Sequence, residues 1–366
     1  MSSNEKLVIT GNLTNRRSFL RNSAGLAGVA LSGTALLQAL AACGDSTATP
    51  GSAGATTSAK IQQAATLQLN WIKNCEFAGI FLAVDKGYYK DEGIDLSLLP
   101  GGGQIDSTTV VVSGSAQIGI VSAATTLLAS RSKGTPLVAI GSTFQKSPGA
   151  LVTKASSGIN SPQDFIGKKI GIQNTARISI ETILKLQKIP MDKVTLVTVT
   201  SDPTPLITGQ IDLLTSFSTN QPLTLKDKGI EPKVFLYYDL GFKQEADVIF
   251  TTEDTLAKRP ELLEGFMRAT MKGWEYTARN PDEVAELVVN KYGEGLSLGQ
   301  QKAQTKAGLE LMYSDLSKEK GMFWMNKEVW DMTNQTAIDS GIITAKLDLN
   351  KAMNFSVLEK LHGKKA

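Results

Sequence analysis

The feature that most constrains the fold is the alternation of short apolar runs, typical of buried strands, with longer stretches that have the hydrophobic period of a helix. Apolar runs of four to eight residues, such as 94–99 and 136–144, alternate with longer stretches in which apolar side chains recur at helical spacing. One such stretch, 76–92, is predicted to be a helix that Gly93 ends. The alternation predicts an α/β protein built from βα units around mainly parallel sheets.

After a strand at 150–153, a second, smaller βα series runs from residue 169 to about residue 240 and predicts a second lobe. Residues 246–251 are expected to form a strand that returns to the first lobe, and the pattern beyond them is helical. Two lobes joined by two crossings, near residues 143–150 and 240–246, are therefore expected. Such crossings often act as hinges, so the lobes are expected to close around a ligand.

The N-terminus carries the parts of an export signal. Arg16 and Arg17 precede a weakly apolar run over residues 24–40, and Leu-Ala-Ala-Cys ends at Cys43. The arginine pair resembles a bacterial twin-arginine signal, and the last four residues resemble a lipobox, whose cysteine becomes the lipidated first residue of the mature chain. An uncleaved membrane anchor is the alternative, although the run is diluted by glycine and serine and is marginal in length for a span.

The residues after Cys43 are rich in Ser, Thr, Ala and Gly, which predicts a flexible tether between a lipid anchor and a globular body. The predicted division of the chain is 1–42 as twin-arginine lipoprotein signal, 43–64 as tether, 65–145 as the first part of lobe 1, 146–244 as an inserted lobe 2, and 245–366 as the completion of lobe 1 with C-terminal helices.

Composition excludes several classes of function. The net charge is +3 over 366 residues, and the lysines are scattered, so nothing indicates nucleic-acid binding. The only cysteines are Cys43 and Cys75, and the only histidine is His362 near the C-terminus. A Ser-His-Asp triad, a Cys-His pair or a histidine zinc site cannot be assembled from this set. We therefore expect no metal and no cofactor, while chemistry by carboxylates alone stays open.

Several phrases in the body together match a known family. They are 69–74 (LNWIKN), 77–83 (FAGIFLA), 86–95 (KGYYKDEGID), 112–120 (VSGSAQIGI), 161–171 (SPQDFIGKKIG) and 208–212 (TGQID). The chain resembles substrate-binding proteins of ABC importers in the nitrate, sulfonate and taurine group, and is most similar to the branch that binds thiamine-pyrimidine precursors and riboflavin. The resemblance implies a two-lobed type II periplasmic-binding-protein fold with a helical C-terminal part. It also implies a monomeric protein at the extracytoplasmic face of the membrane, which delivers a small molecule to an ABC permease and its ATPase.

In such a fold the ligand is expected to meet loops at the carboxyl ends of strands, facing the cleft between the lobes. Trp71 could stack on a planar ring and Asn74 could read its polar edge, although a core tryptophan and a turn asparagine are the alternatives. Backbone N–H groups at two helix starts could bind an anionic or electron-rich group. The candidate ligand-binding residues are Asn70, Trp71, Asn74, Gly102, Gln104, Ser122, Thr125, Phe144, Asn174, Arg177, Asn220 and Gln221.

Three residues also have plainer interpretations. Cys75 is expected to pack as a small apolar residue and Glu76 to be a carboxylate in the first turn of a helix, with a ligand contact as the alternative for each. Arg177 is expected either to pair with an anionic ligand or to be solvated.

The small charge of the candidate set favours a planar heterocycle, such as a thiamine pyrimidine precursor or a flavin, over a sulfonate, taurine or nitrate. Two other classes compete with transport. A related fungal group makes the thiamine pyrimidine from its own active-site histidine with iron, but this body has no histidine outside its tail, so we expect no enzyme. A sensor lipoprotein on the same fold is the other alternative.

Overall fold

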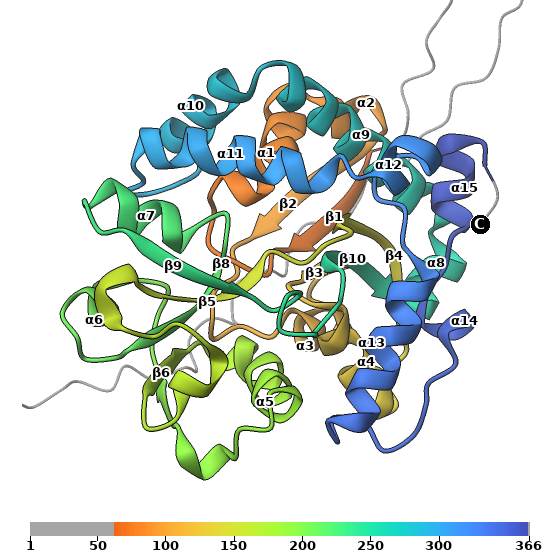
Figure 1. Cartoon of the computed structure of the whole chain (residues 1–366). Helices are drawn as coiled ribbons and strands as arrows, with labels where there is room; N and C mark the ends of the chain where they lie inside the picture. The colour runs from red at the N-terminus through yellow and green to blue at the C-terminus, as the bar shows by residue number, and fades with distance from the viewer. Residues whose placement is uncertain (1–61, 365–366) are drawn as a thin grey trace, which may run out of the picture. The chain divides into compact units, whose positions relative to one another are not determined.

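The computed structural model describes residues 62–364, which build two five-stranded sheets flanked by helices (Figure 1). The predicted twin-arginine signal, the lipobox with Cys43 and nearly all of the tether lie outside the described residues. Within the described part of the chain, no helix is both long enough and apolar enough to cross a membrane.

The first sheet contains four strands from the first part of the body and one that arrives much later in the chain. Its order is β2 (Ile94–Leu99), β1 (Gln63–Gln68), β3 (Ile118–Val121), β10 (Ala246–Thr252) and β4 (Leu137–Phe144). β1 is parallel to β2 and β3, but β10 is antiparallel to both β3 and β4. The expectation of mainly parallel pairing is wrong at this strand, because β10 enters the sheet directly from the second lobe and not after a crossover helix.

The second sheet is built entirely from the segment between β4 and β10. Its order is β7 (Thr195–Thr198), β6 (Lys169–Ile172), β8 (Leu213–Phe217), β5 (Gly149–Lys154) and β9 (Pro232–Leu236). β6 is parallel to its two neighbours, but β5 is antiparallel to both of its own, so the expectation of mainly parallel pairing is wrong at β5 as well. The chain passes from the first sheet to the second between β4 and β5, and returns between β9 and β10.

The helix predicted over 76–92 is interrupted. The structure has the short 3₁₀ helix η1 (Cys75–Phe77), then α1 (Ala78–Asp85) and α2 (Tyr88–Asp91). Gly87 separates the last two, with φ of 75°, a left-handed conformation that ends a helix and that glycine adopts without a steric cost.

The remaining helices of the two lobes follow their strands. They are α3 (Ser107–Val112), α4 (Ala124–Ser132), η4 (Asn174–Ala176), α5 (Arg177–Leu186), α6 (Thr204–Ile207) and α7 (Gln221–Asp227).

The chain beyond β10 is helical, as predicted. Its helices are α8 (Glu253–Lys258), α9 (Pro260–Arg279), α10 (Pro281–Lys291), α11 (Leu298–Met312), α12 (Asp315–Lys320), α13 (Lys327–Asp339), α14 (Leu349–Ala352) and α15 (Ser356–His362). α9 crosses α1 very closely: a Cβ on Gly273 would lie 2.0 Å from the carbonyl oxygen of Gly79. Such a contact between backbones requires glycine at the crossing, and it fixes α9 over the first lobe.

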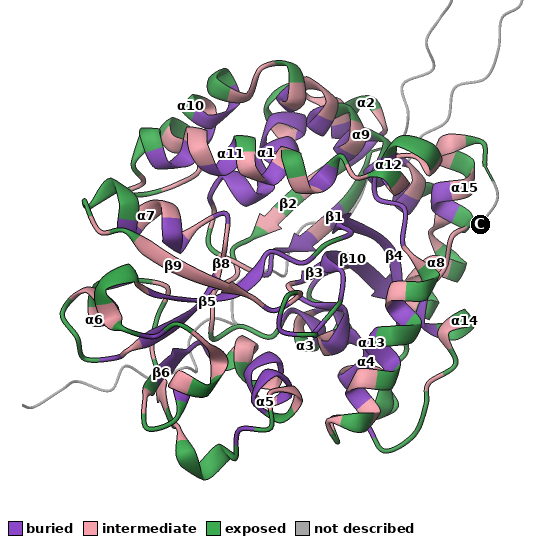
Figure 2. Ribbon diagram, in the orientation of Figure 1, coloured by how far each residue is buried: buried purple, intermediate pink, exposed green. Residues whose placement is uncertain are grey.

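Each sheet has its own hydrophobic core (Figure 2). The large core of the first lobe includes Leu67, Phe81, Phe250 and Phe266. The cores of the second lobe are smaller and lie on the two faces of its sheet, around Phe165 and around Leu225. Separate cores allow each lobe to hold its shape while the crossings between them bend.

A candidate ligand-binding cleft

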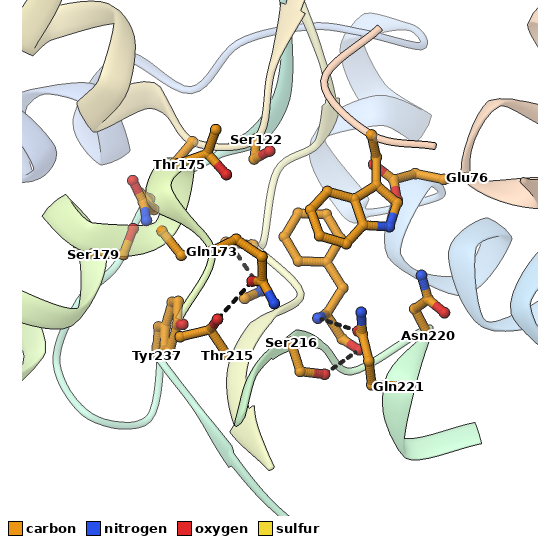
Figure 3. Close-up of a pocket in the computed structure, with 17 residues that line it drawn as sticks. Glu76, Ser122, Gln173, Thr175, Ser179, Thr215, Ser216, Asn220, Gln221 and Tyr237 are labelled. Atoms are coloured by element: carbon orange, nitrogen blue, oxygen red, sulfur yellow. Dashed lines mark hydrogen bonds between the residues drawn. The ribbon is translucent and has the colours of Figure 1, made fainter. Parts of the chain in front are cut away.

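A cavity of about 600 Å³, its open mouth included, lies between the two sheets (Figure 3). Strand ends position its walls: Trp71 follows β1, Ser122 follows β3, Gln173 follows β6 and Phe217 ends β8. Carboxyl ends of strands therefore meet here from both lobes, as in other open α/β sheets that bind ligands. The lining residues are Trp71, Glu76, Ser122, Ala123, Ser147, Gly149, Gln173, Thr175, Ala176, Ser179, Thr215, Ser216, Phe217, Asn220, Gln221, Tyr237 and Gln244.

Aromatic side chains supply the apolar part of the wall. Trp71 is half-buried and packs partly on the core of the first lobe, while Phe217 and Tyr237 lie on the second lobe. A Cβ on Gly149 would lie 2.6 Å from the Tyr237 ring, so glycine at the start of β5 is what lets this ring lie across the strand. The cavity thus offers flat apolar faces from both lobes.

The polar part of the wall consists of amides and hydroxyls that hydrogen bonds to other protein groups keep in place. The Gln173 Oε1 accepts from the Thr215 Oγ1 at 2.6 Å, and its Nε2 donates to the Thr200 carbonyl at 3.1 Å. The Gln221 Oε1 accepts from the backbone N–H of Phe217 at 3.2 Å. Each amide is fixed by these bonds and retains an N–H and a lone pair for a further partner.

A buried pair of carboxyls lies at the first-lobe side. The Asn70 Nδ2 is 3.3 Å from the Glu76 Oε1, 2.9 Å from the Ser122 Oγ and 3.0 Å from the Asp247 Oδ1. Burial raises the pKa of Glu76 well above its usual value, and the neighbouring Asp247 charge raises it further. Burial also raises the pKa of Asp247, to about 7. Burial therefore favours the protonated form of both carboxyls.

Polar atoms without hydrogen-bond partners and a strained backbone occur at this carboxyl pair. Among the described residues, the Asn70 Oδ1 and the Asp247 Oδ2 are buried without a hydrogen-bond partner. Asp247 has φ of 49°, which is uncommon for a residue with a Cβ. Backbone strain beside unsatisfied polar atoms is found mainly at functional sites.

The cavity wall carries no positive charge. Among the described residues that line it there is no lysine, arginine or histidine, and Glu76 is the only carboxyl. The first turn of α4 does not replace a cation, because the N–H of Ala124 already donates to the Glu245 carbonyl at 3.1 Å and the Thr125 Oγ1 donates to the Gln244 Oε1 at 2.7 Å. Burial also disfavours a negative charge on Glu76, so the wall that the described residues form has no cation and is close to neutral.

A second cavity of about 910 Å³ adjoins the first and shares Trp71, Asn220 and Gln221 with it. The Gln300 Nε2 of α11 donates to the Asn220 Oδ1 of α7 at 3.2 Å, so the two lobes are in contact beside both cavities. Its other lining residues are Ile72, Asn74, Ser201, Asp202, Pro203, Thr224, Asp227, Lys228, Gly295, Leu296, Ser297, Gln300 and Gln301.

A family model described as NMT1/THI5 like matches residues 74–284, more than half of the chain. The chain belongs to the NMT1/THI5-like family. The riboflavin-binding protein RibY of Chloroflexus aurantiacus is 26% identical over 83% of this chain and 89% of its own length. A 4-amino-5-hydroxymethyl-2-methylpyrimidine phosphate synthase of Legionella pneumophila is 32% identical over 61% of this chain and 72% of its own. The formylaminopyrimidine-binding protein of Halalkalibacterium halodurans is 23% identical over 62% of this chain and 70% of its own.

Solved structures confirm the predicted fold class. The alkanesulfonate-binding protein SsuA of Xanthomonas axonopodis pv. citri, bound to MOPS, superposes with a TM-score of 0.63 at 11% identity, over 81% of this chain and all of that one. The aliphatic sulphonate binding protein SsuA of Escherichia coli superposes with a TM-score of 0.60 at 14% identity, over 79% of this chain and 91% of that one. This NMT1/THI5-like chain thus has the periplasmic-binding-protein fold, and the family resemblance inferred from its sequence is confirmed.

Of the predicted site residues, Trp71, Ser122, Asn220 and Gln221 line the first cavity, and Asn74 lines the second. The Asn74 Oδ1 accepts from the Glu76 N–H at 2.9 Å and so caps η1, the turn role given above as its alternative. Whether these side chains touch a ligand stays a prediction.

Other predicted residues lie behind the wall. Asn70 and Thr125 are buried beneath it, and Phe144 is buried in the first lobe against α11. Cys75 is buried and its pKa is raised to about 12 by burial, so it is a packed neutral thiol.

The remaining predicted residues lie outside the lining of both cavities. Gln104 accepts a hydrogen bond from the Asn174 Nδ2 and so links the lobes, and Gly102 lies two residues before it with φ of 155°. Arg177 pairs with Glu181 on the surface at 3.3 Å, which fits the solvated alternative.

Sequence reasoning did not select Glu76, Gln173, Thr215 or Tyr237 for the cavity. Gln173 had a usable signal, because it directly follows a predicted strand and precedes the chosen Asn174. Glu76 does lie in the first turn of a helix, as expected, but it is buried and not solvated.

Proposed function

We propose that this chain is a solute-binding protein that captures a small, neutral, planar heterocycle and hands it to an ABC importer without transforming it. The observation that carries this proposal is a cavity wall without a cation among the described residues, in which aromatic faces alternate with fixed amides and hydroxyls. Pockets of this kind bind through ring stacking and a few placed hydrogen bonds.

An anionic ligand fits this wall poorly. A sulfonate or nitrate enclosed here would lose its water and gain no cation, and an unpaired buried charge is strongly disfavoured. Two donors at the start of α4 are already bonded to Glu245 and Gln244. The sulfonate alternative raised from the sequence therefore takes second place, although SsuA shares the fold.

A nitrogen heterocycle fits better. Trp71 offers a ring face, Gln173 and Gln221 each keep a donor and an acceptor, and the Glu76 carboxyl can accept an N–H. Among the relatives, one is named for riboflavin and one for formylaminopyrimidine. Both compounds have the flat ring and polar edge that this wall would recognise.

The absence of catalysis is also our proposal, since the family includes proteins named as synthases. The cavity is lined by no histidine or cysteine among the described residues. His362 lies elsewhere, with its Nε2 2.9 Å from the Met322 carbonyl and its ring beside Trp324. No group of three His, Cys, Asp or Glu side chains within residues 62–364 is placed to hold a metal ion, so iron-dependent synthesis does not fit this chain.

The envelope location belongs to the same proposal. Lipidation of Cys43 after twin-arginine export would tether the two lobes at the outer face of the cell membrane, beside the permease. The supporting observation is the order of the motifs in the sequence: arginine pair, short apolar run, lipobox, then a tether.

Titration calorimetry with the mature chain tests the ligand class. Riboflavin and formylaminopyrimidine are compared with taurine and a linear alkanesulfonate. We expect at least one heterocycle to bind with a Kd of about 10 µM or tighter, and neither sulfur compound to give heat at millimolar concentration. Tight binding of a sulfonate that a heterocycle does not displace would overturn the proposal.

A further inference from the structure

The second cavity lies directly beside the proposed ring site, and we propose that it holds an uncharged, polyhydroxylated tail of the same ligand. This inference rests on the proposed function and narrows it, from planar heterocycles in general to a ring that carries a polyol chain. Three observations support it: the continuity of the two cavities, the chemistry of the second wall and the balance of its charges.

Continuity comes from shared residues. Trp71, Asn220 and Gln221 line both cavities, so a ring stacked on Trp71 has one edge directed to the second cavity. Asn220 is the N-cap of α7 on one lobe, and its Oδ1 accepts from the Gln300 Nε2 on the other lobe. A substituent on the ring would therefore pass between α7 and α11 without leaving the protein.

Most of the residues that line the second cavity are polar, while Ile72, Pro203 and Leu296 are apolar. Its buried inner side presents the amides of Asn74, Gln300 and Gln301, and its exposed rim presents the Asp202 and Asp227 carboxylates. Hydroxyls of Ser201, Thr224 and Ser297 complete it. A chain of hydroxyl groups matches these polar residues, because each hydroxyl both donates and accepts, whereas an apolar tail would make no hydrogen bond to them.

The charges of the second wall select against a phosphate. Its charged residues are Asp202, Asp227 and Lys228, so carboxylates outnumber cations by two to one. All three are exposed, and a dianionic phosphate placed among them would meet net repulsion. The tail is therefore an alcohol and not its phosphate ester.

Three flavins that share one ring system but differ in their side chain test the contributions of the polyol chain and of the phosphate separately. Riboflavin carries a ribityl chain, lumiflavin has a methyl group in its place, and flavin mononucleotide carries the phosphorylated chain. We expect the mature chain to bind riboflavin at least tenfold more tightly than lumiflavin, about the effect of one or two well-made hydrogen bonds. Flavin mononucleotide should bind about tenfold more weakly than riboflavin.

A double variant, Thr224→Val with Asp227→Asn, removes a hydroxyl and a carboxylate from the second wall without changing the size of either side chain. It should weaken riboflavin about tenfold and leave lumiflavin unchanged. Asp192→Asn is the matched control, because Asp192 is exposed on the same lobe and lines neither cavity. It should change neither affinity.

Equal affinity for riboflavin and lumiflavin, or an equal loss of both in the double variant, would refute the tail site and leave the ring site intact. Binding of formylaminopyrimidine with no binding of riboflavin would also refute it, while the proposed function stands. If no heterocycle binds at all, the proposed function fails first and the tail site fails with it.

Discussion

Buried carboxyls should make this protein less stable as the pH rises from 5 to 7. Glu245 is fully buried in the crossing between the lobes, where its side chain accepts from the Asn326 N–H and the Trp330 Nε1, both at 2.7 Å. Burial raises its pKa from 4.5 to about 8. The folded state therefore keeps a proton through a pH range in which the unfolded chain has released it.

The sign and size follow from this difference. A carboxyl with a raised folded pKa contributes stability that is fully present below its unfolded pKa and is lost as the pH rises through the folded value. One extra proton in the folded state lowers the free energy of unfolding by about 1.4 kcal/mol per pH unit. Glu245 alone thus accounts for about 3 kcal/mol between pH 5 and 7, and the Glu76–Asp247 pair acts in the same direction.

The two carboxylates whose pKa values are lowered act outside this window. The pKa values of Asp164 and Asp282 are lowered, the first by backbone N–H groups of Asn160 and Ser161 and the second by Lys306. Both effects act below about pH 4, where these groups take up protons. The window from pH 5 to 7 therefore reports the buried carboxyls.

Urea unfolding of the mature chain at half-unit steps of pH is the measurement. Glu245→Gln should lower stability at pH 5, because one bond to Asn326 or Trp330 is lost, and should flatten the slope by about 1.4 kcal/mol per pH unit. Glu310→Gln, on the exposed side of α11, is the control and should keep the wild-type slope. A wild-type free energy that is flat or rises from pH 5 to 7, or an unchanged slope in Glu245→Gln, would refute the reasoning.

Two further predictions concern the ring site and the anchor. Trp71→Ala should weaken heterocycle binding about 5- to 150-fold and barely change the melting temperature. Trp330→Ala, at a fully buried position, should instead cost about 3–5 kcal/mol of stability. Full affinity in a folded Trp71→Ala protein would contradict the stacking role. Cys43→Ser should abolish lipidation and leave an unprocessed precursor in membrane fractions, and an unchanged mobility and fractionation would contradict the lipobox assignment.

The order of elements could be predicted from the sequence because it is encoded locally. Short apolar runs predicted strands such as 94–99 and 246–251, and the second series of βα units predicted the second sheet. Pairing direction is not local. β10 looks like any other buried strand, and its antiparallel pairing depends on the chain having just returned from the other lobe.

Burial of α11 shows a second limit of the sequence. Gln300, Gln301, Gln304 and Thr305 are buried, although their composition is typical of a solvated helix face. Contacts with residues distant in the sequence bury them. The Gln301 Oε1 accepts from the Cys75 N–H at 2.8 Å, and the Gln300 Nε2 donates to the Asn220 Oδ1. A buried polar face of this kind has no hydrophobic period, so no sequence pattern reveals it.

The candidate site was predictable to the extent that it follows strand ends. Trp71, Ser122, Asn220 and Gln221 were selected by that rule and line the cavity. Gln104 and Asn174 follow the same rule, but they meet each other at the edge of the cleft, because the two lobes touch there. The rule identifies the correct loops, while the packing of one lobe on the other decides which side chains in those loops face the cavity.

The carboxyl pair links the stability of the protein to its site. Glu76 and Asp247 are buried together without a cation, Asp247 adopts a left-handed backbone, and one of its oxygens has no partner among the described residues. Each feature costs stability, and an uncharged amide at either position would remove the electrostatic cost. The hydrophobic core of the first lobe, which includes Leu67 and Phe250, contains neither carboxyl. Glu76 also lines the first cavity, so this cost falls beside the proposed ring site, and we expect the pair to take part in recognition of the ligand.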